Sequence, residues 1–168
     1  PDNENQYLFD GEWIDFESFD VTIKIKVLGK ALYNYKEKAF WSVHGPVIKG
    51  EKATYAVKYS KADDIRIIEQ WYKMNKATNF EQWKNAMGMM SIPMFNAGYA
   101  DNKGNIFYLY NASLPIRNEQ YNWKEVLPGD TSNALWSKYL EFDNLPMVKN
   151  PSIGYIQNCN STPFTTTN

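Results

Sequence analysis

The stretch Val21-Thr22-Ile23-Lys24-Ile25-Lys26-Val27 decides the fold class of this chain. Its β-branched apolar residues alternate with threonine and lysine, which is the two-residue period of a strand with one buried face. The lysines on the other face would discourage edge-to-edge pairing with another sheet. We therefore predict a strand over 21–27 that ends at Gly29.

More strands are expected on both sides of this one. Residues 7–13 contain Asp10-Gly11, a dipeptide typical of a tight hairpin turn. Residues 39–48 indicate two strands around a turn at His44-Gly45-Pro46, and residues 53–59 are again rich in β-branched and aromatic types. Residues 1–6 are polar and are expected to be loose. Residues 7–60 are thus predicted to be mainly strands.

The hydrophobic period then changes to 3.6 residues, which predicts a pair of helices over 63–92. Asp63 and Asp64 suit the start of the first helix. Its apolar residues fall on two stripes, so we expect it to be buried on most of its circumference. These stripes are Ile65, Ile68 and Tyr72, and Ile67, Trp71 and Met74. Thr78-Asn79-Phe80-Glu81 fits a capping box for the second helix, which Pro93 ends. The apolar face of that helix is Phe80, Trp83, Met87 and Met90.

After the helices, residues 94–110 predict a hairpin that turns at Asp101-Asn102-Lys103-Gly104. Residues 111–168 are expected to be mostly irregular, with a last strand over 154–160. Strands, two helices and further strands indicate an α+β fold rather than a series of βαβ units. The length of 168 residues fits a single domain or a fragment of one.

Composition excludes several classes of protein. Hydrophobic residues make up 43% of the chain and aromatic residues 16%, which is too apolar for a disordered protein. The net charge of −1 argues against a non-specific nucleic-acid binder. With one cysteine and one histidine, the chain can form neither an internal disulfide nor a zinc site built from Cys and His. No apolar run is long enough for a membrane helix.

Four features invite a catalytic or metal-binding interpretation, and each has a simpler one. Ser42 and His44 would share a strand face, but the sequence indicates no third residue that would orient His44 as a base. His-Gly-Pro is also an ordinary turn. Cys159 has no basic neighbour and is more typical of a small buried residue. Pro1 could act as a base only in an apolar pocket, and the residues after it are polar. The loop at Asp101 lacks the last ligand of a calcium loop.

The residues alone therefore predict an α+β domain without a self-sufficient active site. A binding or structural module that uses aromatic side chains to hold a glycan or a partner chain stays open.

The order of short motifs over residues 7–164 resembles the penicillin acylase family of N-terminal-nucleophile amidohydrolases. Among its members, those grouped with the acyl-homoserine-lactone and aculeacin-type acylases are the most similar. The motifs are His44-Gly45-Pro46-Val47, Trp71, Trp83, Tyr99-Ala100-Asp101, Gly104-Asn105-Ile106, Pro115, Leu127-Pro128-Gly129, Leu145-Pro146, Asn150-Pro151, Gly154-Tyr155-Ile156 and Asn158-Cys159-Asn160-Ser161-Thr162-Pro163.

This resemblance implies that the chain is an internal fragment of the β-chain of an acylase with the layered αββα architecture. In that family the new N-terminal residue of the self-cleaved β-chain, usually serine, is the nucleophile and its α-amine is the base. That residue would lie upstream of Pro1, so the fragment alone is expected to be inactive. The parent would cleave the amide bond of an N-acylated small molecule through an acyl-enzyme, as a periplasmic or secreted enzyme. Its partners would be the remainder of the β-chain and the α-chain, and no metal or other cofactor is assigned to this chain.

Three site residues follow from the resemblance. Asn160 matches the asparagine of the oxyanion hole, whose amide stabilises the tetrahedral intermediate. Trp71 and Phe95 match walls of the acyl pocket. The alternatives are a turn cap before Pro163 for Asn160 and plain core packing for the two aromatic residues.

Overall fold

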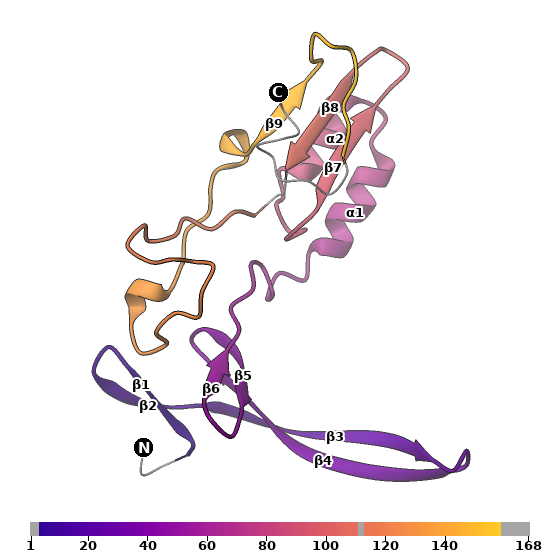
Figure 1. Cartoon of the computed structure of the whole chain (residues 1–168). Coiled ribbons are helices and arrows are strands. Elements are labelled where there is room, and N and C mark those ends of the chain that lie inside the picture. Colours follow the sequence, from indigo (N-terminus) through magenta and orange to yellow (C-terminus); the bar gives the residue numbers. More distant parts are fainter. Residues whose placement is uncertain (1–3, 111–112, 159–168) are drawn as a thin grey trace. The chain divides into compact units, whose positions relative to one another are not determined.

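The computed structural model describes residues 4–110 and 113–158 (Figure 1). They form two compact units, which are described separately below. Unit 1 draws on residues 1–59 and 117–136, and unit 2 on residues 60–116 and 137–168. The chain contains antiparallel sheets and a two-helix segment, so the predicted α+β class is confirmed.

Unit 1 begins with a hairpin that turns at Asp10-Gly11, as predicted. Its strands are β1 (Gln6–Phe9) and β2 (Glu12–Asp15), and both turn residues have the positive φ that such a turn requires. A four-stranded antiparallel sheet follows in the order β3-β4-β5-β6. Its strands are β3 (Glu17–Val27), β4 (Ala31–Ser42), β5 (Gly45–Lys49) and β6 (Thr54–Ala56). The strand predicted over 21–27 is thus confirmed within a longer one, while the run 53–59 forms only the three residues of β6.

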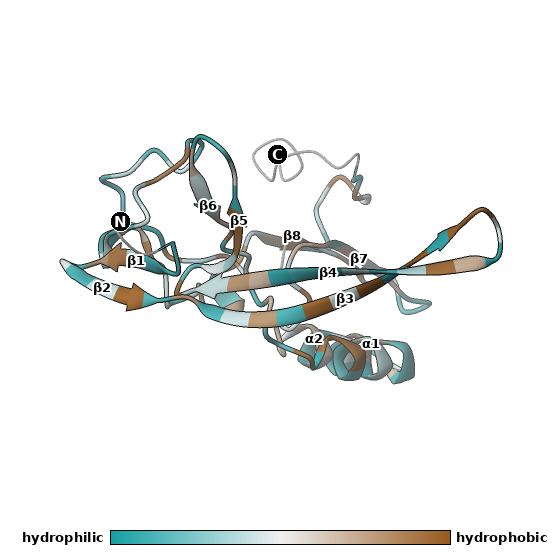
Figure 2. Cartoon of the chain, turned by 90° about the horizontal axis from the view of Figure 1, so that it is seen from below, coloured by the Kyte–Doolittle hydropathy of each residue, from teal (hydrophilic) through white to brown (hydrophobic). Residues whose placement is uncertain are grey.

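The ribbon of β3 and β4 has one apolar and one basic face. Ile23 pairs with Tyr35, and Lys24 pairs with Asn34 on the opposite face, an alternation that colours both strands in Figure 2. The prediction that the apolar face is buried is wrong for the described residues of unit 1, because the apolar side chains of β3 stay exposed. Its apolar residues on β3 remain 38–50% exposed; they are Phe19, Val21, Ile23, Ile25 and Val27.

A tight turn joins β4 to β5, where Ser42 pairs with Gly45. Gly45 has a φ of 118°, which disfavours any residue with a side chain. A Cβ at this position would also collide with the carbonyl oxygen of Val57. The backbone of Val57 is held there because its N–H donates to the carbonyl of Pro46 at 2.9 Å. Glycine is therefore required by both conformation and space.

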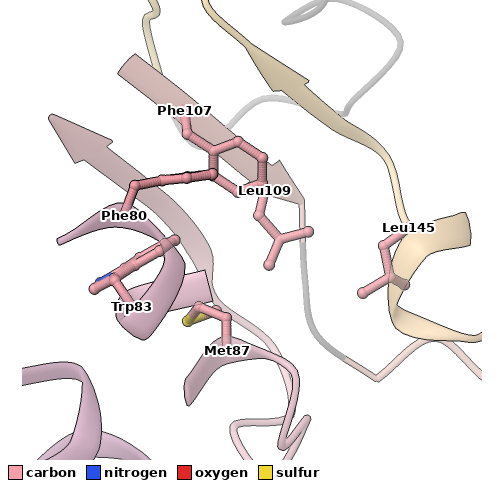
Figure 3. Packing of buried hydrophobic residues seen from close by; sticks show 6 residues of the cluster. All are labelled: Phe80, Trp83, Met87, Phe107, Leu109 and Leu145. Carbon is pink, nitrogen blue, oxygen red and sulfur yellow. The ribbon is translucent and has the colours of Figure 1, made fainter. Parts of the chain in front are cut away.

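Unit 2 packs two helices against a three-stranded antiparallel sheet of order β7-β8-β9. The helices are α1 (Ile67–Lys76) and α2 (Phe80–Met87), and the strands are β7 (Asn96–Ala100), β8 (Ile106–Tyr110) and β9 (Met147–Lys149). The predicted hairpin over 94–110 is therefore confirmed. Figure 3 shows the core, in which side chains of α2 face those of β8 and Leu145. Its buried members are Phe80, Trp83, Met87, Phe107, Leu109 and Leu145.

Both helices begin later than predicted. The first helical residue of α1 is Ile67, and Arg66 at its N-cap makes no side-chain capping bond. Asp64 instead binds Arg66. In α2 the cap is Asn79, whose Oδ1 accepts from the N–H of Gln82 at 2.9 Å. The amide of Gln82 in turn accepts from the N–H of Thr78, so the capping box is displaced by one residue.

Two further predictions are wrong for the described residues. Helix α1 is not buried on most of its circumference: Gln70 is its buried residue, while Ile68 and Tyr72 are exposed. The core of unit 2 is filled mainly by α2. Of the α1 stripes, Met74 packs against this core, while Ile65, Ile68 and Tyr72 stay exposed. Residues 154–158 form no strand, and the third strand of the sheet is β9.

Candidate functional site

Unit 2 contains a pocket to which α1, α2 and the start of β7 contribute. Trp71 on α1 and Phe95 just before β7 meet edge to face, with ring centroids 6.0 Å apart and planes at 84°. Both rings line this pocket, which has a volume of about 330 Å³. Its other lining residues are mostly apolar: Met74, Asn75, Trp83, Met87, Ile92, Asn96, Ala97 and Gly98. The structure thus brings together the two aromatic residues that the sequence analysis selected.

Burial differs sharply among the residues that line the pocket. Met87 and Ile92 are each 1% exposed, while Trp71 is 42% and Phe95 53% exposed. Neither aromatic residue belongs to the buried core cluster. The pocket therefore combines a buried aliphatic side with two aromatic rings that remain accessible to solvent.

The chain returns to this pocket shortly before residue 159. Asn96, which lines the pocket, donates from Nδ2 to Oδ1 of Asn158 at 3.2 Å. A Cβ on Gly98, another lining residue, would lie in ordinary contact with Ile156, at 3.7 Å from its Cδ1. Residues 156–158 therefore run beside β7. Asn160 and Cys159 lie outside the described residues, as does Pro1.

The loop between α2 and β7 is held by polar side chains that the sequence analysis did not identify. Ser91 donates from Oγ to Oδ2 of Asp64 at 3.1 Å, although 27 residues separate the two. The same carboxylate accepts a bidentate pair of hydrogen bonds from Arg66 at 2.6 and 2.8 Å. The Arg66 guanidinium is the largest cause that holds the pKa of Asp64 well below its usual range.

We expect this carboxylate to make stability depend on pH. The folded-state pKa of Asp64 lies below its unfolded value of about 3.9. Its stabilising effect is thus fully present above about pH 4 and is lost as the pH falls below that value. Asp64→Asn should therefore lower the melting temperature at pH 7 and have a smaller effect at pH 3. Asp143→Asn is the control, because the ion pair of Asp143 with Lys84 is exposed and should contribute little at pH 7. An equal effect of Asp64→Asn at both pH values would contradict the assignment.

His44 in unit 1 does not form a nucleophile–base pair with Ser42. The carbonyl oxygen of Gly129 can only accept, so His44 donates to it from Nε2, at 2.9 Å. The hydroxyl of Ser42 accepts from the backbone N–H of His44 and donates to the carbonyl of Gly45. The interpretation of His-Gly-Pro as a structural turn is therefore confirmed.

The short motifs of the sequence contact one another across long separations. His44 of the His-Gly-Pro turn binds Gly129 of Leu-Pro-Gly, 85 residues later. In unit 2, Ile106 of Gly-Asn-Ile binds Asn150 of Asn-Pro through both its N–H and its carbonyl. These two pairs of motifs therefore join distant segments, one within each unit.

The described residues contain neither a metal-ligand cluster nor a membrane-spanning helix. Within 4–110 and 113–158, no three His, Cys, Asp or Glu side chains are grouped so that they could hold a metal ion. No helix in this part of the chain has the length and apolar character needed to cross a membrane.

Comparison with protein families matches residues 1–168 to the model described as Penicillin amidase. The chain belongs to the penicillin amidase family. The resemblance inferred from the ordered motifs is therefore confirmed.

Several members of the penicillin amidase family can be compared directly. The chain is 29% identical to penicillin G acylase of Escherichia coli over 165 residues, which cover 94% of this chain and 18% of that protein. It is 24% identical to the acyl-homoserine lactone acylase PvdQ of Pseudomonas fluorescens strain Pf0-1 over 123 residues, 68% of this chain and 16% of that protein. The solved structure of a thermostable penicillin G acylase from Alcaligenes faecalis matches with a TM-score of 0.83 and 28% identity, over 96% of this chain and 29% of that one. The chain thus spans less than a fifth of the length of these two curated relatives.

Proposed function

We propose that this chain is part of an amidase that hydrolyses the amide bond of an N-acylated small molecule. The observation that carries the proposal is the pocket beside Trp71 and Phe95, found in a chain that belongs to the penicillin amidase family. Relatives named penicillin G acylase and acyl-homoserine lactone acylase support a substrate of this class. Acylase relatives also support the α-chain and the remainder of the β-chain as partners, and a periplasmic or secreted location by resemblance.

The pocket suits the acyl group rather than the leaving amine. Most of its lining residues have apolar side chains, and Asn75 and Asn96 supply carboxamides. Such a pocket binds an apolar acyl chain by removing its surface from water, while a charged amine would lose hydration without a partner. Trp71 and Phe95 are placed to contact that chain from two sides.

Asn160 is proposed to stabilise the oxyanion next to this pocket. Asn158 is bound to the pocket residue Asn96, and two residues of chain span at most about 7 Å. The carbonyl oxygen of the bound acyl group is proposed to accept from the side-chain amide of Asn160. That amide would donate to the oxygen as negative charge develops on it.

The proposed reaction has two steps. The nucleophile outside this chain attacks the acyl carbonyl, the C–N bond breaks, and the amine leaves with the proton that the nucleophile gave up. Water then attacks the acyl-enzyme, which releases the carboxylic acid and restores the nucleophile. Because the chain lacks this nucleophile, residues 1–168 alone should be inactive.

Chromogenic N-acyl 4-nitroanilides test this function. The full-length protein should release nitroaniline, whereas a protein restricted to residues 1–168 should release none. Clear turnover by the restricted protein would show that the nucleophile lies inside this chain. Absence of turnover by the full-length protein for every acyl group, together with a glycan-dependent shift of tryptophan fluorescence, would favour the binding module instead.

Trp71→Ala in the full-length protein is expected to lower kcat/KM for aromatic and long-chain acyl amides by about tenfold or more. The effect on the acetyl amide should be much smaller, because a short acyl group does not reach the ring. Tyr72→Ala is the matched control: it removes the adjacent aromatic side chain of α1, which does not line the pocket. Equal losses for acetyl and long-chain substrates would exclude Trp71 from the acyl pocket.

A further inference from the structure

Gln70 is a completely buried amide in a helix whose apolar residues are mostly exposed. Its exposed fraction is 0%, and it is the residue that α1 buries. A glutamine loses favourable hydration when it is buried, so its carboxamide must be compensated by hydrogen bonds. The contacts of this side chain show what it holds.

Both ends of the carboxamide bind main chain on the other side of the pocket. Oε1 accepts from the backbone N–H of Ser91 at 2.8 Å and of Ile92 at 2.9 Å. Nε2 donates to the carbonyl of Met87, the last residue of α2, at 3.4 Å. One side chain therefore connects α1 to the end of α2 and to the loop that follows it.

The loop that Gln70 holds adopts a conformation that requires such support. Met90 has a φ of 51°, in the left-handed region that residues with a side chain rarely adopt. Its carbonyl accepts from the hydroxyl of Ser113, and the hydroxyl of the next residue, Ser91, donates to Asp64. Gln70 supplies the contacts from α1, and it binds the two N–H groups that directly follow Met90.

The hydrogen bonds of Gln70 join α1, which carries Trp71, to the loop that leads to Phe95. Trp71 is the next residue on α1, and the loop continues through Pro93 to Phe95. Met87 and Ile92, which Gln70 contacts through their backbones, also line the pocket. The residue next to Trp71 thus bonds to the backbone of the loop that leads to Phe95, the partner of the Trp71 ring.

We propose that Gln70 is a positioning residue that determines which acyl groups the pocket accepts. This inference rests on the proposed amidase function, which it extends to a determinant of substrate choice. Gln70 does not touch the reacting atoms; it acts by holding Ser91 and Ile92, and through them the width of the pocket. An apolar residue at position 70 would leave two buried N–H groups without a partner, so the loop would move away from α1.

The test uses Gln70→Leu and Gln70→Glu in the full-length protein with a series of 4-nitroanilides from acetyl to long-chain and arylacetyl. The ratio of kcat/KM between the preferred acyl group and the others should fall at least tenfold in Gln70→Leu, mainly through KM. Glutamate at this fully buried position is expected to be protonated, so Gln70→Glu keeps an oxygen that accepts from Ser91 and Ile92 and gains a hydroxyl that can donate to the Met87 carbonyl. Its ratio should therefore stay within about threefold of the unaltered protein. Gln82→Leu is the control, because it removes an exposed glutamine of α2 whose side chain binds Thr78 at the helix start and does not line the pocket.

The possible outcomes separate this inference from the proposed function. No turnover by the unaltered protein would overturn the amidase itself. Turnover with an unchanged acyl ratio in Gln70→Leu would overturn the role of Gln70 alone. If Gln70→Leu does not fold, the test rests on Gln70→Glu. A tenfold shift of its acyl-group ratio would contradict the proposal. Hydrogen exchange of the Ser91 and Ile92 amides that stays as slow as in the unaltered protein would support it.

Discussion

If Asn160 forms the proposed oxyanion hole, its replacement by alanine in the full-length protein is expected to lower kcat by about 10²–10³-fold. A side-chain amide that donates to the oxyanion is effective mainly in the transition state, where the negative charge develops. KM should therefore change little, because the neutral carbonyl of the bound substrate gains much less from this hydrogen bond. The measurement is steady-state hydrolysis of the preferred N-acyl 4-nitroanilide.

Asn102→Ala provides the matched control for this experiment. Asn102 is an exposed asparagine in the turn between β7 and β8, so its removal should leave kcat within about twofold. Asn160→Asp adds a second comparison: a carboxylate would repel the oxyanion and should be at least as harmful as alanine. A loss of kcat well under tenfold for Asn160→Ala would remove Asn160 from the oxyanion hole.

Gly45→Ala is expected to be the most destabilising single change in unit 1. The φ of 118° costs a residue with a side chain about 1–2 kcal/mol, and the collision of its Cβ with the Val57 carbonyl adds a similar amount. The total of about 3 kcal/mol should appear as faster hydrogen exchange of the amides of β5 and β6, which the turn and Val57 adjoin.

Gly11→Ala separates the two causes. Gly11 also has a positive φ, 88°, but nothing lies within 4 Å of the Cβ that alanine would add. Its substitution should therefore cost only the conformational part, about 1 kcal/mol. If both variants destabilise unit 1 equally, the Val57 carbonyl moves aside without cost and the steric argument fails.

The spacing of apolar residues predicted those elements whose buried face is set by their own sequence. The apolar face of α2 is an example, since Phe80, Trp83 and Met87 recur at helical spacing and all three are buried. The hairpins at Asp10-Gly11 and around Asp101 were predictable because local turn chemistry sets them. The stripes of α1 did not indicate burial, because a stripe shows that a face is apolar and not whether the described chain provides a layer against it.

The candidate site could be predicted only in part. Trp71 and Phe95 were selected through the family resemblance, and their contact depends on a loop whose path no period describes. Gln70 carried no signal, since a glutamine in a helical pattern ordinarily indicates the solvent face. Asp64 was expected to cap a helix, whereas its carboxylate binds Arg66 and Ser91. Such polar contacts depend on tertiary distances that the spacing of residues in one element does not contain.

The contact between His44 and Gly129 sets an order of events during synthesis of the chain. The β3–β4 ribbon joins neighbouring residues through a turn at Leu28-Gly29, so it can form as soon as both strands leave the ribosome. Gly129 is translated 85 residues after His44, which takes about 4–17 s at typical rates of elongation. Throughout that interval the turn from the ribbon to β5 lacks the partner that His44 binds in the folded unit. The nascent protein therefore passes through a stage in which this turn has no partner, and codon changes that slow translation between residues 45 and 129 should lower its soluble yield.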